Sequence, residues 1–348
     1  MNIPRGTVPT RAETERALLV AVAGKGAGEK QAAEDSLGEL ALLAQAAGAE
    51  VAGKLVQPLT VPSKTHYVGQ GKLEELVALK DTLDYNVLIL DDELSPLQQQ
   101  HLEEATRVKV IDRASLILDI FARRARTREG RLQVELAQHQ YLLPRLAGQW
   151  SHLERLGGGI GTRGPGESQL ETDRRLIRQK IQRLKKQTED IRKHRALYRQ
   201  KRQKSGIPVV ALVGYTSAGK STLLNALCRA DVMTGQKLFA TLDPTTRRLN
   251  LPGGAALLTD TVGFIRKLPP AIVTAFRATL EELDEADMLL HVVDMSSPDA
   301  PEQCQTVEQI LGELNLREKP RITALNKIDR LLPEDRTRDE AAAMATRR

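Results

Sequence analysis

The stretch that most constrains the fold is residues 209–222, which read VVALVGYTSAGKST. An apolar run leads into Gly214, four residues separate it from Gly219-Lys220-Ser221, and a helical pattern of leucines follows. Strand, glycine-bounded loop and helix in this order predict a phosphate-binding loop rather than a chance glycine-rich turn. Its backbone N–H groups and the helix dipole favour an anion, Lys220 reaches β/γ-phosphate oxygens and the Ser221 hydroxyl suits Mg²⁺. The expected nucleotide contacts in the loop are Gly214, Tyr215, Thr216, Ser217, Ala218, Gly219, Lys220, Ser221 and Thr222.

Composition bounds the class of protein. A length of 348 residues predicts two or three domains, and 41% hydrophobic residues with only 3% aromatic ones predict cores of Leu, Ile, Val and Ala. The two cysteines, Cys228 and Cys304, provide neither a disulfide framework nor zinc spacing. The first residues lack an apolar signal core, and no apolar run is long enough to span a membrane. We therefore expect a cytoplasmic protein, and we expect it to be monomeric.

Charge is distributed unevenly along the chain. Residues 113–206 contain 23 Lys and Arg against 9 Asp and Glu, whereas the rest of the chain contains 28 basic and 36 acidic residues. A basic middle segment between acidic flanks indicates a polyanionic partner, and we expect contact with nucleic acid. The alternative is a helical face that is merely solvated.

Strands alternate with helices over residues 1–112, which predicts a small parallel α/β domain. Strands are expected at 17–23, 50–56, 87–90 and 108–111, and helices at 36–47, 73–83 and 96–105. A turn at Gly69-Gln70-Gly71-Lys72 has two glycines before a helix and could hold a phosphate. Two glycines in this spacing commonly form only a tight turn, so a second nucleotide site here is the less favoured reading.

Residues 113–203 read as one helical stretch broken once. Apolar residues recur at steps of four and three on both sides of the break, which predicts an antiparallel helical hairpin with His139 packed in its seam. The break contains six glycines within ten residues, 157–166, and cannot be helical. A glycine-rich tip on a basic arm suits insertion into RNA, against the alternative of a solvent loop. The expected RNA contacts are Gly157, Gly158, Gly159, Gly161, Arg163, Gly164, Arg174 and Arg175.

From residue 207 to 348 strands and helices alternate again, with strands expected at 255–259, 288–293 and 321–325 and helices at 270–283 and 303–314. Asp260 closes a strand 40 residues after Lys220 and can hold the Mg²⁺ shell through water, while the Gly263 N–H can bond a γ-phosphate. Thr241 is the first choice, and Thr245 the second, for a hydroxyl that joins the Mg²⁺ shell when the γ-phosphate is present. Lys220 and Gly263 are the expected catalytic residues. Further nucleotide contacts are expected at Phe239, Ala240, Thr241, Leu242, Asp243, Asp260, Thr261, Val262 and Gly263.

The tetrapeptide Asn326-Lys327-Ile328-Asp329 follows a strand and predicts guanine specificity. The two acceptors of the Asp329 carboxylate match the paired donors of guanine, which adenine lacks. Lys327 can pack over the base, and Asn326 can tie this loop to the phosphate-binding loop. At the position after Gly263, where many GTPases place a glutamine that orients water, the chain has Phe264. We therefore expect hydrolysis to be slow and to need a partner or another residue.

The chain resembles the HflX family of translational GTPases over nearly its whole length. The segments that carry the likeness are YVGQGKLEEL at 67–76, IFARRARTREGRLQVELAQHQYLLPRL at 120–146, GGGIGTRGPGE at 157–167, FATLDPTTR at 239–247 and DTVGFI at 260–265. The resemblance implies a GTPase that uses Mg²⁺ with GTP, binds the large ribosomal subunit and its RNA, and splits or rescues stalled ribosomes. It maps the family's phosphate and Mg²⁺ residues onto 214–221, Thr241 and 260–263, and its guanine residues onto Asn326, Lys327 and Asp329.

The expected fold class is therefore α/β with three parts: an N-terminal domain at 1–112, a basic helical hairpin at 113–206 and a GTPase domain at 207–348. Only 19 residues follow Asp329, so the further strand, closing helix and small domain that the family continues with are not recognisable, and we expect a C-terminally truncated GTPase domain. The alternative function is an RNA- or ribosome-binding protein whose truncated domain does not hydrolyse GTP. Guanine-nucleotide affinity discriminates between the two.

Overall fold

The computed structural model describes residues 14–157, 169–203, 206–228, 239, 241–268 and 282–331. The glycine-rich tip predicted beyond residue 157, the predicted contact Ala240 and most of the helix predicted at 270–283 lie outside these residues. The chain divides into two compact units, Met1–Leu116 and Ile117–Arg348. Within the described residues, no helix is both long and apolar enough to cross a membrane.

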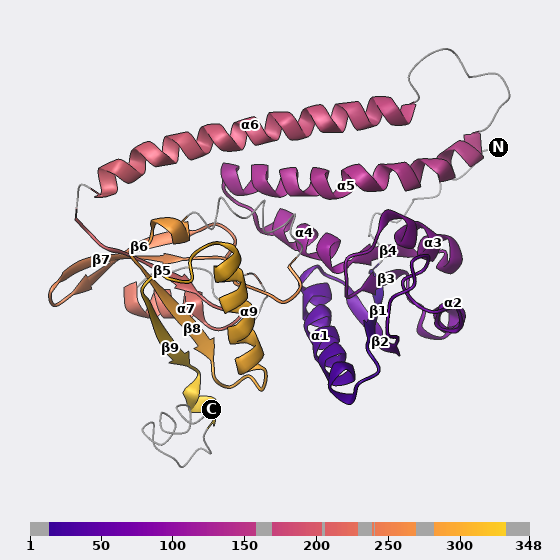
Figure 1. The fold of residues 1–348 in the computed structure, drawn as a ribbon, viewed down its shortest axis with the longest axis horizontal. Helices are drawn as coiled ribbons and strands as arrows, with labels where there is room; N and C mark the ends of the chain where they lie inside the picture. Colours follow the sequence, from indigo (N-terminus) through magenta and orange to yellow (C-terminus); the bar gives the residue numbers. More distant parts are fainter. Residues whose placement is uncertain are drawn as a thin grey trace, which may run out of the picture. The chain divides into compact units, whose positions relative to one another are not determined.

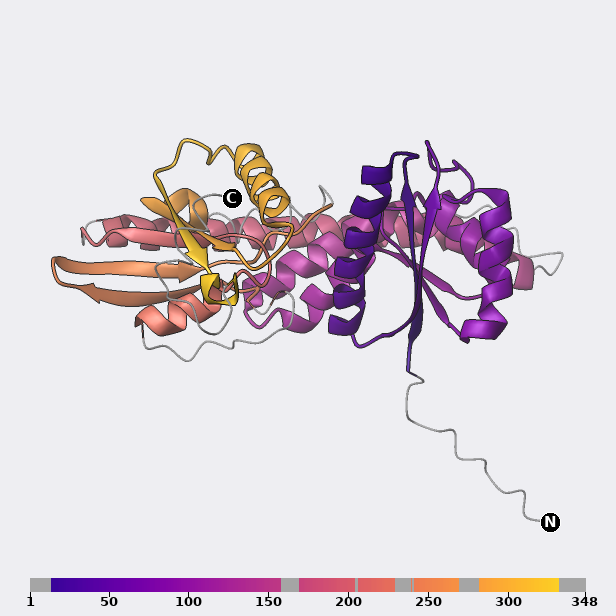
Figure 2. The same cartoon turned by 90° about the horizontal axis from the view of Figure 1, so that it is seen from below.

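The first unit contains a four-stranded parallel sheet, as predicted, and its strand order is β2-β1-β3-β4. Helix α1 lies on one face of the sheet and α2 and α3 on the other (Figures 1 and 2). Helices α2 and α3 pack through leucines onto the inner side chains of β1 and β3. The elements are β1 (Arg16–Ala23), α1 (Ala27–Ala46), β2 (Glu50–Pro58), α2 (Gln70–Leu83), β3 (Val87–Leu90), α3 (Pro96–Thr106) and β4 (Lys109–Asp112).

Helix α1 begins at Ala27, nine residues before the start that the sequence predicted. Its first turns are largely exposed, so they carry none of the apolar periodicity that marked the buried part from Ser36 onward. Ala, Glu, Lys and Gln are strong helix formers and account for the extension. An exposed helical turn is therefore readable from propensity and not from hydrophobic pattern.

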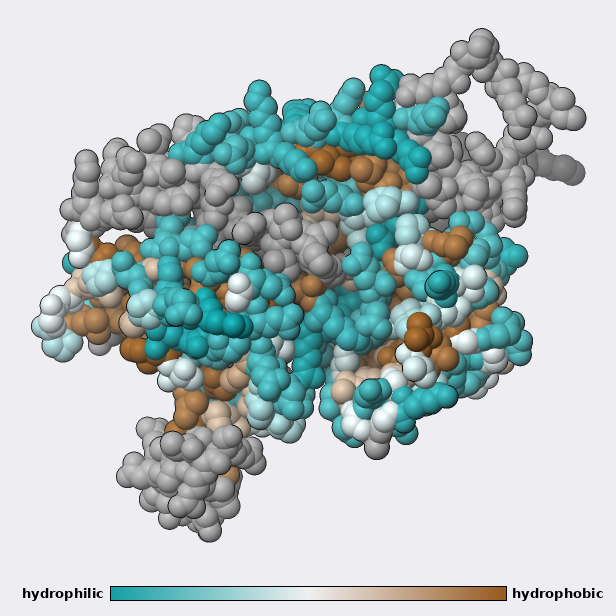
Figure 3. Space-filling model, viewed as in Figure 1, coloured by the Kyte–Doolittle hydropathy of each residue, from teal (hydrophilic) through white to brown (hydrophobic). Residues whose placement is uncertain are grey.

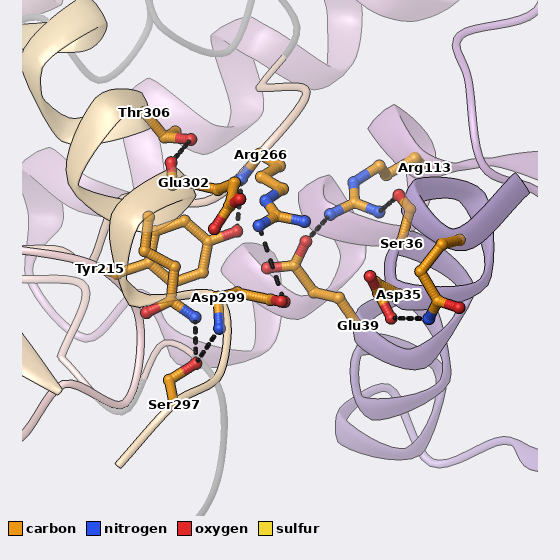
Figure 4. Close-up of polar contacts among 12 residues, drawn as sticks. Asp35, Ser36, Glu39, Arg113, Tyr215, Arg266, Ser297, Asp299, Glu302 and Thr306 are labelled. Carbon is orange, nitrogen blue, oxygen red and sulfur yellow. Dashed lines mark hydrogen bonds and ion pairs between the residues drawn. The ribbon is translucent and has the colours of Figure 1, made fainter. Parts of the chain in front are cut away.

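Arg113, at the start of helix α4 (Arg113–Arg124), forms a buried charged network beneath the sheet edge of the first unit. Its Nη1 donates to the carboxylate of Asp91 over 2.8 Å, and its Nη2 bonds Glu39. The hydroxyl of Ser36 donates to the same Asp91 over 2.8 Å, and Figure 4 shows Arg113 between Ser36 and Glu39. Arg113 and Asp91 are 1% and 0% exposed, so each charge depends on its partners for solvation.

The second unit carries a long helical hairpin made by α5 (Arg128–Gly157) and α6 (Gln169–Gln203), which run side by side in Figure 1. The predicted seam is present: Leu136, Ile181 and Leu184 are buried against one another, with Leu132, Leu143 and Ile177 at their edges. An ion pair of 2.7 Å joins Glu135 of α5 to Lys180 of α6. The prediction of a single break was wrong, because the chain also leaves the helix between α4 and α5, at residues 125–127.

Pro144 lies inside α5 and supplies no backbone N–H to the helix. The next residue, Arg145, is 6% exposed, and its Nη1 donates to the Tyr141 carbonyl over 2.9 Å. Its guanidinium also lies 3.5 Å from the centre of the Tyr141 ring. The Arg145 side chain thus supplies a donor to the helix backbone one turn away from the proline.

A five-stranded sheet forms the rest of the second unit, with strand order β6-β7-β5-β8-β9. All neighbours pair in parallel except β6 with β7, which are antiparallel. Strand β6 was not predicted, because its residues are polar and largely exposed and read as a turn-rich loop. The elements are β5 (Val209–Val213), α7 (Lys220–Cys228), β6 (Thr245–Leu251), β7 (Gly254–Asp260), β8 (Met288–Asp294), α9 (Ala300–Glu313), β9 (Arg321–Asn326) and the 3₁₀ turn η1 (Ile328–Leu331).

We predict that Arg113→Ala destabilises the first unit by about 3–5 kcal/mol, because it leaves Asp91 buried without its cation. Lys30→Ala is the matched control, since its pair with Glu34 is exposed at both ends and contributes less than about 1 kcal/mol. Urea unfolding followed by circular dichroism measures both. Equal shifts of the unfolding midpoint in the two variants would contradict the assignment.

Candidate nucleotide-binding site

The phosphate-binding loop starts where β5 ends, between β7 and β8 at the carboxyl edge of the sheet. Gly214 and Gly219 have φ angles of 147° and 103°, which side-chain-bearing residues rarely adopt. A Cβ at Gly214 would strike the Val292 carbonyl, and one at Gly219 would strike the side-chain amide of Asn326. Both glycines are therefore required by backbone angle and by space, as their spacing in the sequence predicted.

Lys220 is 6% exposed and lies at the first turn of α7. Its Nζ donates to the Gly214 and Tyr215 carbonyls over 3.0 and 2.8 Å, so the side chain folds back over the loop. Burial lowers the pKa of Lys220 to about 8, while the nearby charge of Asp260 acts in the opposite direction. The ammonium therefore sits where an anion above the loop would gain a strong charge-assisted partner.

Three oxygen atoms converge beside Lys220. The Ser221 hydroxyl lies 2.8 Å from that of Thr241 and donates to the Asp260 carboxylate over 2.6 Å, and Thr241 donates to the same carboxylate oxygen over 2.8 Å. Asp260 is 0% exposed. The two hydroxyl oxygens, 2.8 Å apart, fit neighbouring positions around an octahedral Mg²⁺, whose ligands lie about 2.0–2.1 Å from the ion. The Asp260 carboxylate lies next to both hydroxyls, where it can bond water of the same shell. The residues present thus fit Mg²⁺, with Thr241 rather than Thr245 at the cluster.

The segment after Asp260 is fastened to the phosphate-binding loop. Thr216 N donates to the Phe264 carbonyl over 2.8 Å, and Phe264 N donates to the Gly214 carbonyl over 3.1 Å. Gly263 leaves no room for a side chain, because a Cβ there would come within 3.0 Å of Lys220 Nζ and closer still to the Thr216 backbone. The Phe264 side chain is 2% exposed and has no polar atom. The backbone of 263–264, rather than a side chain, therefore faces the phosphate end of the loop.

Arg266 extends this fastening toward α9. Its backbone N–H donates to the Tyr215 hydroxyl over 2.9 Å, and its guanidinium pairs with Asp299 at 3.6 Å (Figure 4). The Thr261 hydroxyl donates to the Leu212 carbonyl over 2.6 Å, and Thr261 is 1% exposed. The side chain of this predicted nucleotide contact is therefore buried against the end of β5.

The predicted guanine loop lies against the phosphate-binding loop. Asn326 Nδ2 donates to the Ala218 carbonyl over 2.7 Å, which is the tie expected of this residue. Lys327 Nζ donates to the Ser217 carbonyl over 2.8 Å and pairs with Asp294 over 2.6 Å. Asp329, in η1, is exposed. Asp294 was missed by sequence reasoning, although it ends β8 one strand away from the loop that it supports.

The other predicted contact residues differ in their burial and in the contacts that they make. The Asp243 carboxylate accepts hydrogen bonds from the backbone N–H groups of Arg126 and Thr127. Phe239 and Leu242 are buried, at 2% and 3% exposed, and Thr245 lies in β6, opposite Asp260 in the ladder with β7. Thr222 is exposed, Ala218 is buried and Val262 is 6% exposed. On α6, Arg174 is half-buried and Arg175 is exposed. Gly157 is the last residue of α5.

His291, in the middle of β8, is 4% exposed and pairs with Val213 at the start of the loop. Burial, with smaller contributions from the charges of Arg321 and Lys220, lowers the pKa of His291 to about 4, against the opposing charge of Glu308. A neutral imidazole is therefore part of the sheet that carries the loop.

Fold and site together define a P-loop GTPase. Family models match the chain at residues 34–122 (GTP-binding GTPase N-terminal), 124–202 (GTP-binding GTPase Middle Region) and 209–327 (50S ribosome-binding GTPase). GTPase HflX of Caldanaerobacter subterraneus subsp. tengcongensis is 54% identical over 330 residues, 94% of this chain and 76% of that protein. GTPase HflX of Escherichia coli is 47% identical over 298 residues, 85% and 70% of the two chains. The chain belongs to the HflX family of GTPases.

Among solved structures, the crystal structure of SsGBP in complex with GDP aligns with a TM-score of 0.51 and 25% identity. The alignment covers 96% of this chain and 88% of that one. The likeness extends over both units and the hairpin, so the described architecture is shared with a protein seen with a guanine nucleotide.

We predict that the second unit loses stability as the pH falls from about 6.5 to about 4, because the unfolded chain protonates His291 before the folded chain does. The full loss is roughly 3 kcal/mol at the acid end. His291→Gln has no proton to take up, so its unfolding midpoint should change less over this range. Thermal unfolding of both proteins at pH 7 and pH 4.5 checks this, and parallel curves would refute it.

Proposed function

We propose that the chain binds GTP with Mg²⁺, hydrolyses it to GDP and phosphate, and does so on the large ribosomal subunit, where it dissociates or rescues stalled ribosomes. The observation that carries the proposal is the convergence of Ser221, Thr241 and Asp260 beside Lys220. These groups come from α7, from the segment before β6 and from β7, and meet at one point.

Each residue at this point has a role in phosphoryl transfer. Lys220 would set its ammonium beside β/γ-phosphate oxygens, and the Gly263 N–H would bond a γ-phosphate oxygen. Ser221 and Thr241 would ligate Mg²⁺ directly, and Asp260 would hold its water shell. The ion, when bound, neutralises charge that develops on the phosphate oxygens.

Hydrolysis by the chain alone is proposed to be slow. Phe264 occupies the position next to Gly263, is buried and has no group that orients water. Acceleration then requires a group supplied by a partner, as in GTPases that receive a residue in trans. This is why we assign the subunit a part in turnover and not only in binding.

The partner is inferred from charge and from the family. The model that matches residues 209–327 describes a 50S ribosome-binding GTPase. Helix α6 presents a hydrophilic outer face in Figure 3, opposite the apolar seam with α5. Phosphate contacts from such a face position a protein on RNA without reading its sequence. The exposed basic side chains of α6 include Arg175, Arg178, Lys180, Arg183, Lys185, Lys186 and Lys193.

The alternative, an RNA-binding protein that does not hydrolyse GTP, is not favoured. Both loops expected to hold the nucleotide are in place, and Asn326 and Lys327 connect them by hydrogen bonds to Ala218 and Ser217. Nucleotide affinity and turnover remain the measurements that separate the two functions.

We predict that Asp329→Asn loses preference for GTP over ATP, because an amide donor replaces one acceptor and meets a guanine donor. The cost in binding free energy is roughly 2–4 kcal/mol. Fluorescent-nucleotide titrations with GTP and ATP measure the preference. The neighbouring Arg330→Gln is the control and should keep it, and an unchanged preference in the Asp329 variant would exclude this role.

Phosphate release measured with and without purified large ribosomal subunits tests the function. We expect slow release alone, acceleration by subunits and loss of both with Lys220→Ala. The double change Lys185→Glu and Lys186→Glu should weaken subunit binding and reduce the slope of log affinity against log salt by about 2, with unassisted release unchanged. Lys54→Glu with Lys64→Glu, at exposed lysines outside the hairpin, is the matched control. Rapid release without subunits, or no acceleration by them, would overturn the proposal.

A further inference from the structure

We propose that Asp243 couples the nucleotide site to the helical hairpin. When GTP is bound, its γ-phosphate side holds Thr241 at the metal position, and the Asp243 carboxylate then caps helix α5. This cap contributes to the preference of the chain for GTP over GDP. The inference rests on the proposed function, because it takes Thr241 as a ligand that only GTP engages. It adds a positioning residue that touches neither nucleotide nor metal.

The contact joins segments more than a hundred residues apart in the sequence. Asp243 accepts hydrogen bonds from Arg126 N over 2.8 Å, from Thr127 N over 3.0 Å and from the Thr127 hydroxyl over 2.5 Å. Thr127 precedes the first residue of α5, and its Oγ1 accepts from Gly130 N over 3.0 Å, as an N-cap does. Asp243 thus adds negative charge at the positive end of the α5 dipole.

Gly130 makes room for this carboxylate. A Cβ at Gly130 would collide with Asp243 Oδ1 and come within 3.1 Å of Thr127 Oγ1. Glycine in the first turns of a helix is otherwise less favourable than alanine. The contact between Asp243 and α5 therefore explains a residue that helix formation alone would not select.

Thr241 lies between two residues, Phe239 and Asp243, whose side chains contact α4 and the start of α5. Two residues after it, Asp243 bonds the start of α5; two residues before it, Phe239 packs edge-on against Phe121 of α4, with ring centres 4.7 Å apart. Both rings are buried, at 2% and 1% exposed. Thr241 itself bonds Ser221 and Asp260 in the opposite direction. One short segment therefore contacts the metal position at its centre and the α4–α5 junction at both ends.

The two contacts must influence each other. Holding Thr241 at the metal position fixes the neighbouring backbone and with it the Asp243 carboxylate, so the cap forms at lower entropic cost. Coupling of this kind is reciprocal: if GTP strengthens the cap, the cap strengthens GTP binding by the same factor. GDP lacks the γ-phosphate and leaves Thr241 without this tie, so the cap should weaken.

Dissociation constants for GDP and for a non-hydrolysable GTP analogue, both with Mg²⁺, test the coupling. Asp243→Ala should reduce the preference for the GTP analogue over GDP by roughly fivefold, within the usual range of such couplings. Thr127→Ala, which changes only the hairpin side, should reduce it similarly, and the double variant should lose no more than either single variant. Asp190→Ala, on the exposed side of α6, is the matched control and should keep the preference.

Gly130→Ala separates the coupling from simple loss of structure. The substitution favours the helix, yet it displaces the Asp243 carboxylate, so it should lower the preference for the GTP analogue without lowering the unfolding midpoint. Amide hydrogen exchange over residues 126–130 should be slower with the GTP analogue than with GDP in the parent protein. This difference should disappear in Asp243→Ala.

Thr241→Ala distinguishes failure of the coupling from failure of the proposed function. If Thr241→Ala lowers the preference for the GTP analogue and Thr127→Ala does not, Asp243 is only a structural cap and the inference is wrong. If Thr241→Ala leaves the preference unchanged, the assignment of Thr241 to the nucleotide fails first. Exchange over 126–130 that is independent of nucleotide in the parent protein would also overturn the coupling.

Discussion

Leu212 of β5 and Asp260 of β7 face each other in a parallel ladder, and the position of this pair determines the rest of the site. The phosphate-binding loop begins two residues after Leu212, so the pairing brings the Asp260 carboxylate to the side of Ser221. Side chains alternate along a strand, so a slip of one residue would turn Asp260 to the opposite face. Neighbouring β8 adds Asp294 at the same edge, and β9 delivers Asn326 to the loop. Strand register thus assembles groups that lie far apart in the sequence.

Much of this arrangement was predictable from local pattern. The parallel strands, the seam of the hairpin and the tie made by Asn326 follow from apolar periodicity and from motifs whose chemistry fixes their spacing. Strand β6 was missed because an exposed strand has no apolar alternation, and the early turns of α1 for the same reason. The Arg113 network was missed because the sequence does not show which charged residues pair with one another in the fold. What could not be predicted was a contact between a motif residue and a distant helix start, as at Asp243.

The segment around Thr241 shows how one sequence motif serves two parts of the protein. Residues 239–243 read as a nucleotide-binding segment, and the hydroxyl of Thr241 lies where that reading requires. Phe239 and Asp243, however, make their described contacts with α4 and the start of α5. Some residues of a nucleotide-binding motif can thus serve contacts within the protein, without each of them touching the ligand. The sequence alone cannot distinguish a motif residue that contacts the ligand from one that contacts another part of the protein.

Pro144 gives α5 a defined elastic property. A helix that is broken at a proline bends at that point, whereas one that is fully hydrogen-bonded resists bending along its whole length. In α5 the Arg145 guanidinium bonds the Tyr141 carbonyl and stacks on its ring, so this side chain bridges the turn that contains the proline. Pro144 lies about halfway along α5, so the Arg145 side chain supports the helix in the turn where its backbone has one donor fewer.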